Sequence, residues 1–149
     1  MKTIIAAVDF SNVTSAVTDM AVSVAKCFNA DLRLFHVIEP EPSFTTYGFS
    51  MAEFPAMGEF RKETQRRADQ LMSGLLTKVQ AELPNITTKM TEGVPLHELL
   101  KEVNESSADL VVVGSHGHGA LASLLLGSVA EGMIRKATVP TLVVPAAPI

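Results

Sequence analysis

Hydrophobic and polar positions along the chain follow two alternating patterns. Short, mainly apolar runs at 3–8, Asp31–Ile38, 110–113 and Thr141–Val144 have the length of β-strands, and a weaker run covers 86–90. The segments between them repeat apolar residues every three or four positions, which is typical of helices that bury one face. Strands that alternate with helices predict an α/β fold, a parallel sheet covered by helices.

The ends of the predicted helices carry their own signals. A first helix is predicted over 13–28, with Asn29 as its C-terminal cap. A second helix covers about 58–82 and stops before Pro84, since the residue before a proline disfavours helical backbone. Pro95 suits the first turn of a third helix.

A glycine-rich segment follows the apolar run at 110–113. Gly114 and Gly117 come first, and Gly127 and Ser128 follow after nine more residues. Glycines allow a positive φ and a close approach of backbone N–H groups to a ligand. A helix predicted over Ser128–Lys136 would add unpaired N–H groups and a positive dipole end. These parts together predict an anion-binding site, with phosphate as the anion, although a tight strand-to-helix connection without a ligand also uses glycines.

Two well-known phosphate-binding motifs do not fit this segment. Gly114 and Gly119 have the Walker spacing, but neither the lysine nor the hydroxyl residue follows. Gly117, Gly119 and Ala122 match the Rossmann spacing, but they follow the fourth predicted strand and no acidic residue lies about twenty positions further on. Both motifs are therefore rejected.

The spacing G-x2-G-x9-G-S resembles the nucleotide-binding signature of the universal stress protein family, in its ATP-binding branch. The resemblance extends over nearly the whole chain, from the first strand, which ends at Asp9, to the closing segment 139–144. It implies an open five-stranded parallel sheet in the order 3-2-1-4-5, with helices on both faces and one nucleotide-binding domain over residues 1–149.

The resemblance also implies which residues would bind the nucleotide. Asp9 would contact the adenosine part, or the phosphates through a metal, and its alternative interpretation is a turn or cap residue. Val37 would read the adenine through its backbone. The residues expected to bind the cofactor are Ala7, Val8, Asp9, Val37, Val113, Gly114, His116, Gly117, Gly127, Ser128, Val129 and Ala130.

Polar residues around the glycines have simpler interpretations as well. Ser128 and Glu131 fit a capping box, in which the serine hydroxyl accepts from the Glu131 N–H and the glutamate reaches back. His116 and His118 fall short of a zinc site, because no cysteine or carboxylate lies beside them. We interpret the histidines as loop residues that flank the phosphates.

Composition narrows the classes of function. The 149 residues are 47% hydrophobic and 19% charged, which is typical of a globular protein, and a net charge of −4 argues against non-specific nucleic-acid binding. One cysteine, Cys27, cannot form an internal disulfide, which favours the cytoplasm. The apolar run at 3–8 is too short for a signal peptide or a membrane span.

A long loop is predicted over 40–58, and aromatic residues gather near it. Its interpretations are a lid or partner surface, or a loop that packs its own aromatics over a sheet edge, and we favour the second. The aromatics between 44 and 60 are Phe44, Tyr47, Phe49, Phe54 and Phe60.

The resemblance implies a stress-response or signalling protein that binds an adenine nucleotide, ATP with Mg²⁺. The alternative is a slow ATPase or a phosphoryl or nucleotidyl transferase, which the missing Walker lysine and the lack of a recognisable base disfavour. A family branch without ATP binding is disfavoured by the intact glycine set. A homodimer is predicted through Thr141–Val144, a short apolar strand at the sheet edge whose pairing Pro140 and Pro145 would limit.

Overall fold

The computed structural model describes residues 1–40, 56–117 and 125–146. Four of the five aromatic residues counted between 44 and 60 lie outside these ranges, as does His118. The role predicted for the loop at 40–58 therefore stays a prediction.

Five strands and four helices alternate along the described chain, as the pattern of apolar residues predicts. In chain order they are β1 (Thr3–Ala7), α1 (Thr14–Phe28), β2 (Asp31–Ile38), α2 (Ala56–Gln80), β3 (Ile86–Glu92), α3 (Pro95–Ser106), β4 (Leu110–Gly114), α4 (Ser128–Lys136) and β5 (Thr141–Val144). All neighbouring strands are parallel, and their order is β3-β2-β1-β4-β5. The predicted fold class and strand order are confirmed.

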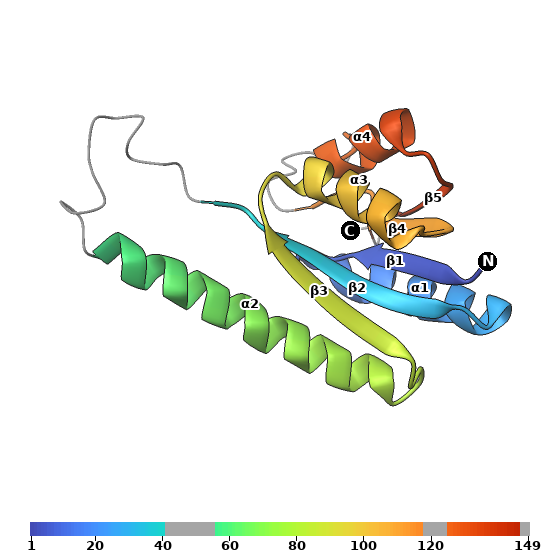
Figure 1. Ribbon diagram of the computed structural model, residues 1–149, viewed down its shortest axis with the longest axis horizontal. Helices are drawn as coiled ribbons and strands as arrows, with labels where there is room; N and C mark the ends of the chain where they lie inside the picture. Colours follow the sequence, from blue (N-terminus) through green and yellow to red (C-terminus); the bar gives the residue numbers. More distant parts are fainter. Residues whose placement is uncertain (41–55, 118–124, 147–149) are drawn as a thin grey trace.

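The sheet lies between helices on its two faces (Figure 1), and a hydrophobic cluster fills the space on each side. Helices α1 and α2 cover one face, where they pack on Ile4, Leu34 and Val112, while α3 and α4 cover the other face, where they pack on Ile5 and Val111. Because side chains of a strand alternate between the faces, the apolar strands β1 and β4 supply both layers.

Element ends differ from the predicted ones by a few residues at most. Strand β3 continues to Glu92 rather than 90, because its parallel pairing with β2 extends to the Ile38–Glu92 pair despite the polar side chains. Asn29 caps α1 in the left-handed conformation, as predicted, and Pro95 begins α3. In the described ranges no helix combines the length and the apolar character that crossing a membrane requires.

Candidate functional site

A cavity of about 1070 Å³ opens at the carboxyl edge of the sheet. It lies where β1 is flanked by β2 on one side and by β4 on the other, the point at which the strand order reverses. Open parallel sheets bind ligands at such a point. All the residues predicted to bind the cofactor, from Ala7 to Ala130, line this one cavity. The structure thus brings the predicted set together, and their contact with a ligand stays a prediction.

Gly117 lies against the carboxylate of Asp9. A Cβ atom added to Gly117 would be 2.7 Å from Oδ2 of Asp9. The other carboxylate oxygen, Oδ1, accepts from the Ser11 N–H at 3.0 Å and from the Thr14 hydroxyl at 3.4 Å. Asp9 therefore holds the turn before α1 and also faces the glycine segment, and its contact with a nucleotide stays a prediction.

The glycines of this segment serve close packing rather than a left-handed backbone. Positive φ was expected there, but among the described glycines only Gly93 has one, at 154°. A Cβ atom on Gly114 would lie 3.0 Å from Cγ1 of Val13, and one on Gly127 would lie 3.2 Å from the carbonyl oxygen of Ser115. The expectation about φ is wrong, and the physical reason for glycine at these positions is the short distance to neighbouring atoms.

Helix α4 begins differently from the predicted capping box. Its N-cap residue is Gly127, not Ser128, and no side chain caps it. The Glu131 N–H donates to the Gly127 carbonyl at 2.9 Å, and the Glu131 carboxylate pairs with Arg135 at 3.1 Å. The capping box is wrong because the helix starts one residue earlier than the box requires, with Ser128 in its first turn.

This start determines which backbone donors face the cavity. The Gly127 N–H donates to the Ser115 carbonyl at 2.7 Å, so that N–H is already used within the protein. The first N–H groups of a helix have no acceptor within it, and here they belong to Ser128, Val129 and Ala130. All three residues line the cavity. The first turn of α4, rather than the Gly127 N–H, is the donor set for an anion.

Ser115 connects the glycine segment to the end of β5 through hydrogen bonds. Its N–H donates to the Val144 carbonyl at 2.8 Å, and its hydroxyl accepts from the Ala146 N–H at 3.1 Å. The same hydroxyl lies 2.8 Å from Nδ1 of His116, whose Nε2 is buried and has no hydrogen-bond partner in the described part of the chain. No local sequence pattern indicates this role, because 31 positions separate Ser115 from Ala146.

His36 is a lining residue that the sequence analysis did not single out. Its Nδ1 lies 2.7 Å from the Val8 carbonyl oxygen, so Nδ1 carries the proton, because a carbonyl can only accept. The ring packs against Phe10 in a tilted arrangement, with the ring centroids 4.4 Å apart, and Phe10 has the rare φ of 60°. The signal in the sequence was its place beside Val37, the residue expected to read the adenine.

Metal ligands are sparse at this edge. In the three described stretches, no group of three or more His, Cys, Asp or Glu side chains could hold a metal ion. Asp9 and Glu39 are lining residues of the cavity, and the Asp9 carboxylate lies against Gly117. Mg²⁺ is commonly bound by one or two carboxylates together with substrate phosphates, and the residues present fit that type of site.

The comparisons with known proteins agree with this architecture. The family model described as the universal stress protein family matches residues 1–145. The universal stress protein MJ0531 of Methanocaldococcus jannaschii is 33% identical over 146 residues, which cover 96% of this chain and 81% of that protein.

Solved structures share the fold. UspA from Lactobacillus plantarum superposes with a TM-score of 0.84 at 22% identity and covers 96% of this chain and 97% of that one. A universal stress protein in complex with cAMP has a TM-score of 0.62 at 26% identity, covering 98% of both chains. The universal stress protein from Archaeoglobus fulgidus in complex with dAMP has a TM-score of 0.70 at 18% identity, covering 97% of this chain and 98% of that one.

The family match spans nearly all of the residues, from β1 through the glycine segment to β5. It confirms the resemblance first indicated by the spacing of Gly114, Gly117 and Gly127. This chain belongs to the universal stress protein family.

Proposed function

We propose that this protein binds an adenine nucleotide, ATP together with Mg²⁺, as a cytoplasmic stress-response or signalling protein built from one domain over residues 1–149. The observation that carries the proposal is the meeting of Asp9, Gly117 and the first turn of α4 in one cavity at the switch point of the sheet. Two structural neighbours are complexes with cAMP and dAMP, which supports an adenine nucleotide as the ligand class.

Each part of the cavity has a distinct role in this proposal. The N–H groups of Ser128, Val129 and Ala130 donate to phosphate oxygens, as helix N-termini do in many phosphate sites. The backbone of Val37, at the end of β2, reads the adenine. Asp9 contacts the adenosine part or holds Mg²⁺ jointly with the phosphates.

The direct test is to identify what the purified protein carries and binds. Heat release followed by mass spectrometry should detect an adenine nucleotide, and calorimetric titration with ATP and Mg²⁺ should give saturable binding near one site per chain. Guanosine triphosphate, titrated in parallel, is the control and should bind more weakly. Protein that neither releases an adenine compound nor binds one in the titration would refute the proposal.

We also propose that β5 joins two copies of the chain. It is the last strand of the sheet order, and Leu142 and Val143 are only half-buried. The carbonyls of Pro140 and Val144 accept from β4, so by alternation the N–H and C=O groups of Val143 point away from β4. An edge with such unpaired groups pairs readily with its own copy about a two-fold axis.

The substitution Val143→Pro removes the outward N–H of β5 and should convert the dimer to a monomer in light scattering. Val143→Ala keeps that N–H and is the matched control, expected to remain dimeric. A wild-type protein that is monomeric at micromolar concentration would contradict the dimer altogether, and a dimeric, folded proline variant would place the interface elsewhere.

A further inference from the structure

The charged side chains that line the cavity are all acidic in the part of the chain that the structure describes. They are Asp9 and Glu39, and none of the twelve Lys and Arg residues lines it there. The segments outside the description, 41–55, 118–124 and 147–149, contain no lysine or arginine in their sequence. The chain therefore offers phosphate groups no lysine or arginine from the glycine segment or from the loop before α2.

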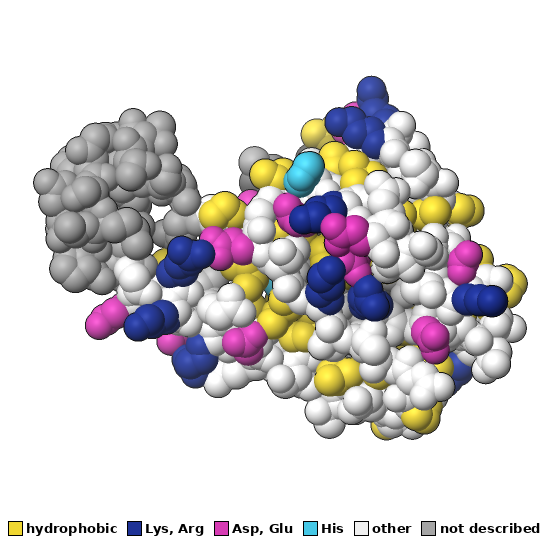
Figure 2. Space-filling model, viewed as in Figure 1, with side chains coloured by type: hydrophobic (Ala, Val, Ile, Leu, Met, Phe, Trp, Pro, Cys, Tyr) yellow, Lys and Arg dark blue, Asp and Glu magenta, His cyan; other side chains and the backbone are white. Residues whose placement is uncertain are grey.

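Most of the cations are paired with carboxylates elsewhere on the molecule. Figure 2 shows basic and acidic side chains next to one another over α3 and β3. The cations in such pairs are Lys26, Arg33, Arg61, Arg66, Lys78, Lys89, Lys101 and Arg135.

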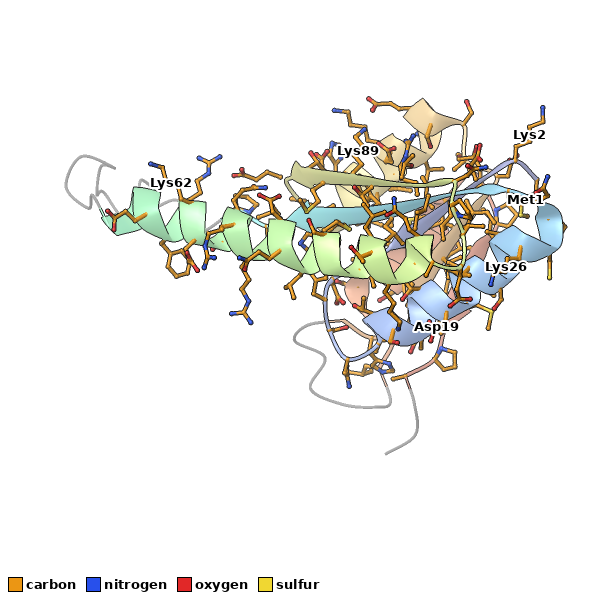
Figure 3. All side chains as sticks on the ribbon, turned by 90° about the horizontal axis from the view of Figure 1, so that it is seen from below. Met1, Lys2, Asp19, Lys26, Lys62 and Lys89 are labelled. Carbon is orange, nitrogen blue, oxygen red and sulfur yellow. The ribbon has the colours of Figure 1, made fainter. Side chains whose placement is uncertain are left out.

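None of the remaining four cations is itself a lining residue of the cavity, although Arg67 is next to the lining residue Ala68 in the chain. Lys2 precedes β1, at the opposite edge of the sheet, and Lys136 is the last residue of α4, whose first turn faces the cavity. In Figure 3, Lys62 points outward near the start of α2, and Lys2 lies at the other end of the molecule. Arg67 is exposed on α2 and does not line the cavity.

Phosphates in this cavity would thus lie near both the first turn of α4 and the carboxylate of Asp9. The N-terminus of a helix carries the equivalent of about half a positive charge, which balances one phosphate in part but not three. The carboxylate of Asp9 lies against Gly117, since a Cβ there would be 2.7 Å from Oδ2. Each phosphate beyond the first adds negative charge near carboxylates in a partly enclosed site, where charges repel more strongly than in bulk water.

From this charge distribution we infer that the cavity selects adenine nucleotides by their phosphate charge, and that AMP binds more tightly than ATP when no divalent cation is present. The inference rests on the proposed adenine-nucleotide binding and specifies its ligand class. A divalent cation bound to the triphosphate lowers its net charge and removes this disadvantage, so the preference between AMP and ATP depends on the cation.

Calorimetric titration of the full chain with adenosine, AMP, ADP and ATP tests the inference, first in EDTA and then in Mg²⁺. In EDTA the affinity should fall by about fivefold for each phosphate after the first, and the gap should narrow as salt is added, because salt screens repulsion. Mg²⁺ should restore ATP binding while it leaves adenosine binding unchanged. ATP binding as tight as AMP in EDTA would overturn the inference while the proposed function stands, whereas failure of every adenine compound would overturn both.

A variant that adds a cation gives the converse test. Leu125 lines the cavity just before the start of α4 and is 69% exposed, so a longer polar side chain can be accommodated. Leu125→Lys should raise ATP affinity in EDTA by about fivefold, with adenosine affinity unchanged. Leu125→Gln is the matched control, similar in size and uncharged, and should leave both affinities as they are.

A second variant removes a negative charge from the cavity instead of adding a positive one. Asp9→Asn keeps an oxygen for the Ser11 N–H and removes the negative charge. This substitution should reduce the ratio of AMP affinity to ATP affinity in EDTA by about fivefold. The ratio is the readout, because a common change in both affinities leaves it unaffected. Glu105→Gln, an exposed neutralisation on α3 outside the cavity lining, should leave the ratio unchanged. An unchanged ratio in both Leu125→Lys and Asp9→Asn would overturn the inference.

Discussion

Two regions of this molecule differ in whether basic side chains accompany their acidic residues. On the face of the sheet covered by α3, Glu102 is 2% exposed and bonds to two cations, Arg33 of β2 and Lys89 of β3. At the carboxyl edge, Asp9 and Glu39 line a cavity that has no Lys or Arg among its described lining residues. Negative charge is balanced by side chains where α3 docks on the sheet. At the cavity, the negatively charged residues lie near the backbone N–H donors of α4, where an anion can bind.

The physical reason lies in what each region must do. A buried carboxylate without a cationic partner would destabilise the fold by several kcal/mol, so Glu102 requires Arg33 and Lys89. At the cavity, Asp9 is only partly buried, and its carboxylate accepts hydrogen bonds from Ser11 and Thr14. The following substitutions separate the two roles, from the largest expected effect to the smallest.

Gly117→Val tests the cavity most severely. The new Cβ would be 2.7 Å from the Asp9 carboxylate, so either the carboxylate or the glycine segment must move. We expect calorimetric affinity for ATP with Mg²⁺ to fall more than about a hundredfold, with the circular dichroism spectrum of the fold retained. Gly74→Ala is the control, because a Cβ at Gly74 on α2 has nothing within 4 Å. Unchanged affinity in the folded variant would contradict the proposed phosphate site.

Glu102→Gln tests the buried cluster. Loss of the charge leaves Arg33 and Lys89 without their shared carboxylate, and because both cations are partly exposed we expect a loss of roughly 2–3 kcal/mol in the free energy of unfolding by urea. Glu105→Gln is the matched control on the same helix, since Glu105 is exposed and lies 3.9 Å from Lys89. Nucleotide affinity should not change in either variant. Equal stability of the two variants would show that the buried cluster contributes nothing specific.

Asp9→Ala removes a single group of the cavity and should have an intermediate effect. Loss of a charge-assisted contact is expected to weaken binding of ATP with Mg²⁺ by about 1–3 kcal/mol. Calorimetry measures it, and thermal unfolding reports separately on the turn that Asp9 holds through Ser11. If affinity is unchanged while the melting temperature falls, Asp9 is a turn residue alone.

The smallest effect is expected on the melting temperature, when Asp109 is substituted at the edge of the sheet opposite the cavity. Its carboxylate accepts from the N–H groups of Lys2 at 2.6 Å and Thr3 at 2.9 Å, and these bonds lower the pKa of the Asp109 carboxyl. A lowered pKa in the folded state contributes stability at neutral pH that is lost as the pH falls through the folded pKa. The melting temperature of Asp109→Asn should therefore lie slightly below wild type at pH 7 and meet it in strong acid. A difference that persists in acid would contradict this assignment.

The fold was predictable to a large extent from the chain itself. Apolar runs such as 110–113 predict buried strands, and the helical spacing before Asn29 predicts α1, because burial of apolar surface dominates local preference. The strand order required the family resemblance, since periodicity does not say which strands become neighbours. Ends of elements were less predictable, as β3 shows, because pairing with β2 extends a strand past its apolar residues.

The cavity was predictable as a set of residues but not in its chemistry. The glycine spacing identified Gly114, Gly117 and Gly127, which do line it. The capping box at Ser128 and the positive φ were wrong because both were argued from local sequence alone.

By itself, the sequence determined the alternation of strands and helices, the residues that gather at the carboxyl edge, and the absence of lysine and arginine between 114 and 127. Only the tertiary structure decided that Asp9 packs on Gly117, that Ser115 bonds to Ala146, and that Glu102 meets two cations. The physical reason is distance along the chain. Hydrophobic periodicity is a local property, whereas contacts between distant residues depend on how the strands are placed side by side, and that placement determines which charges meet.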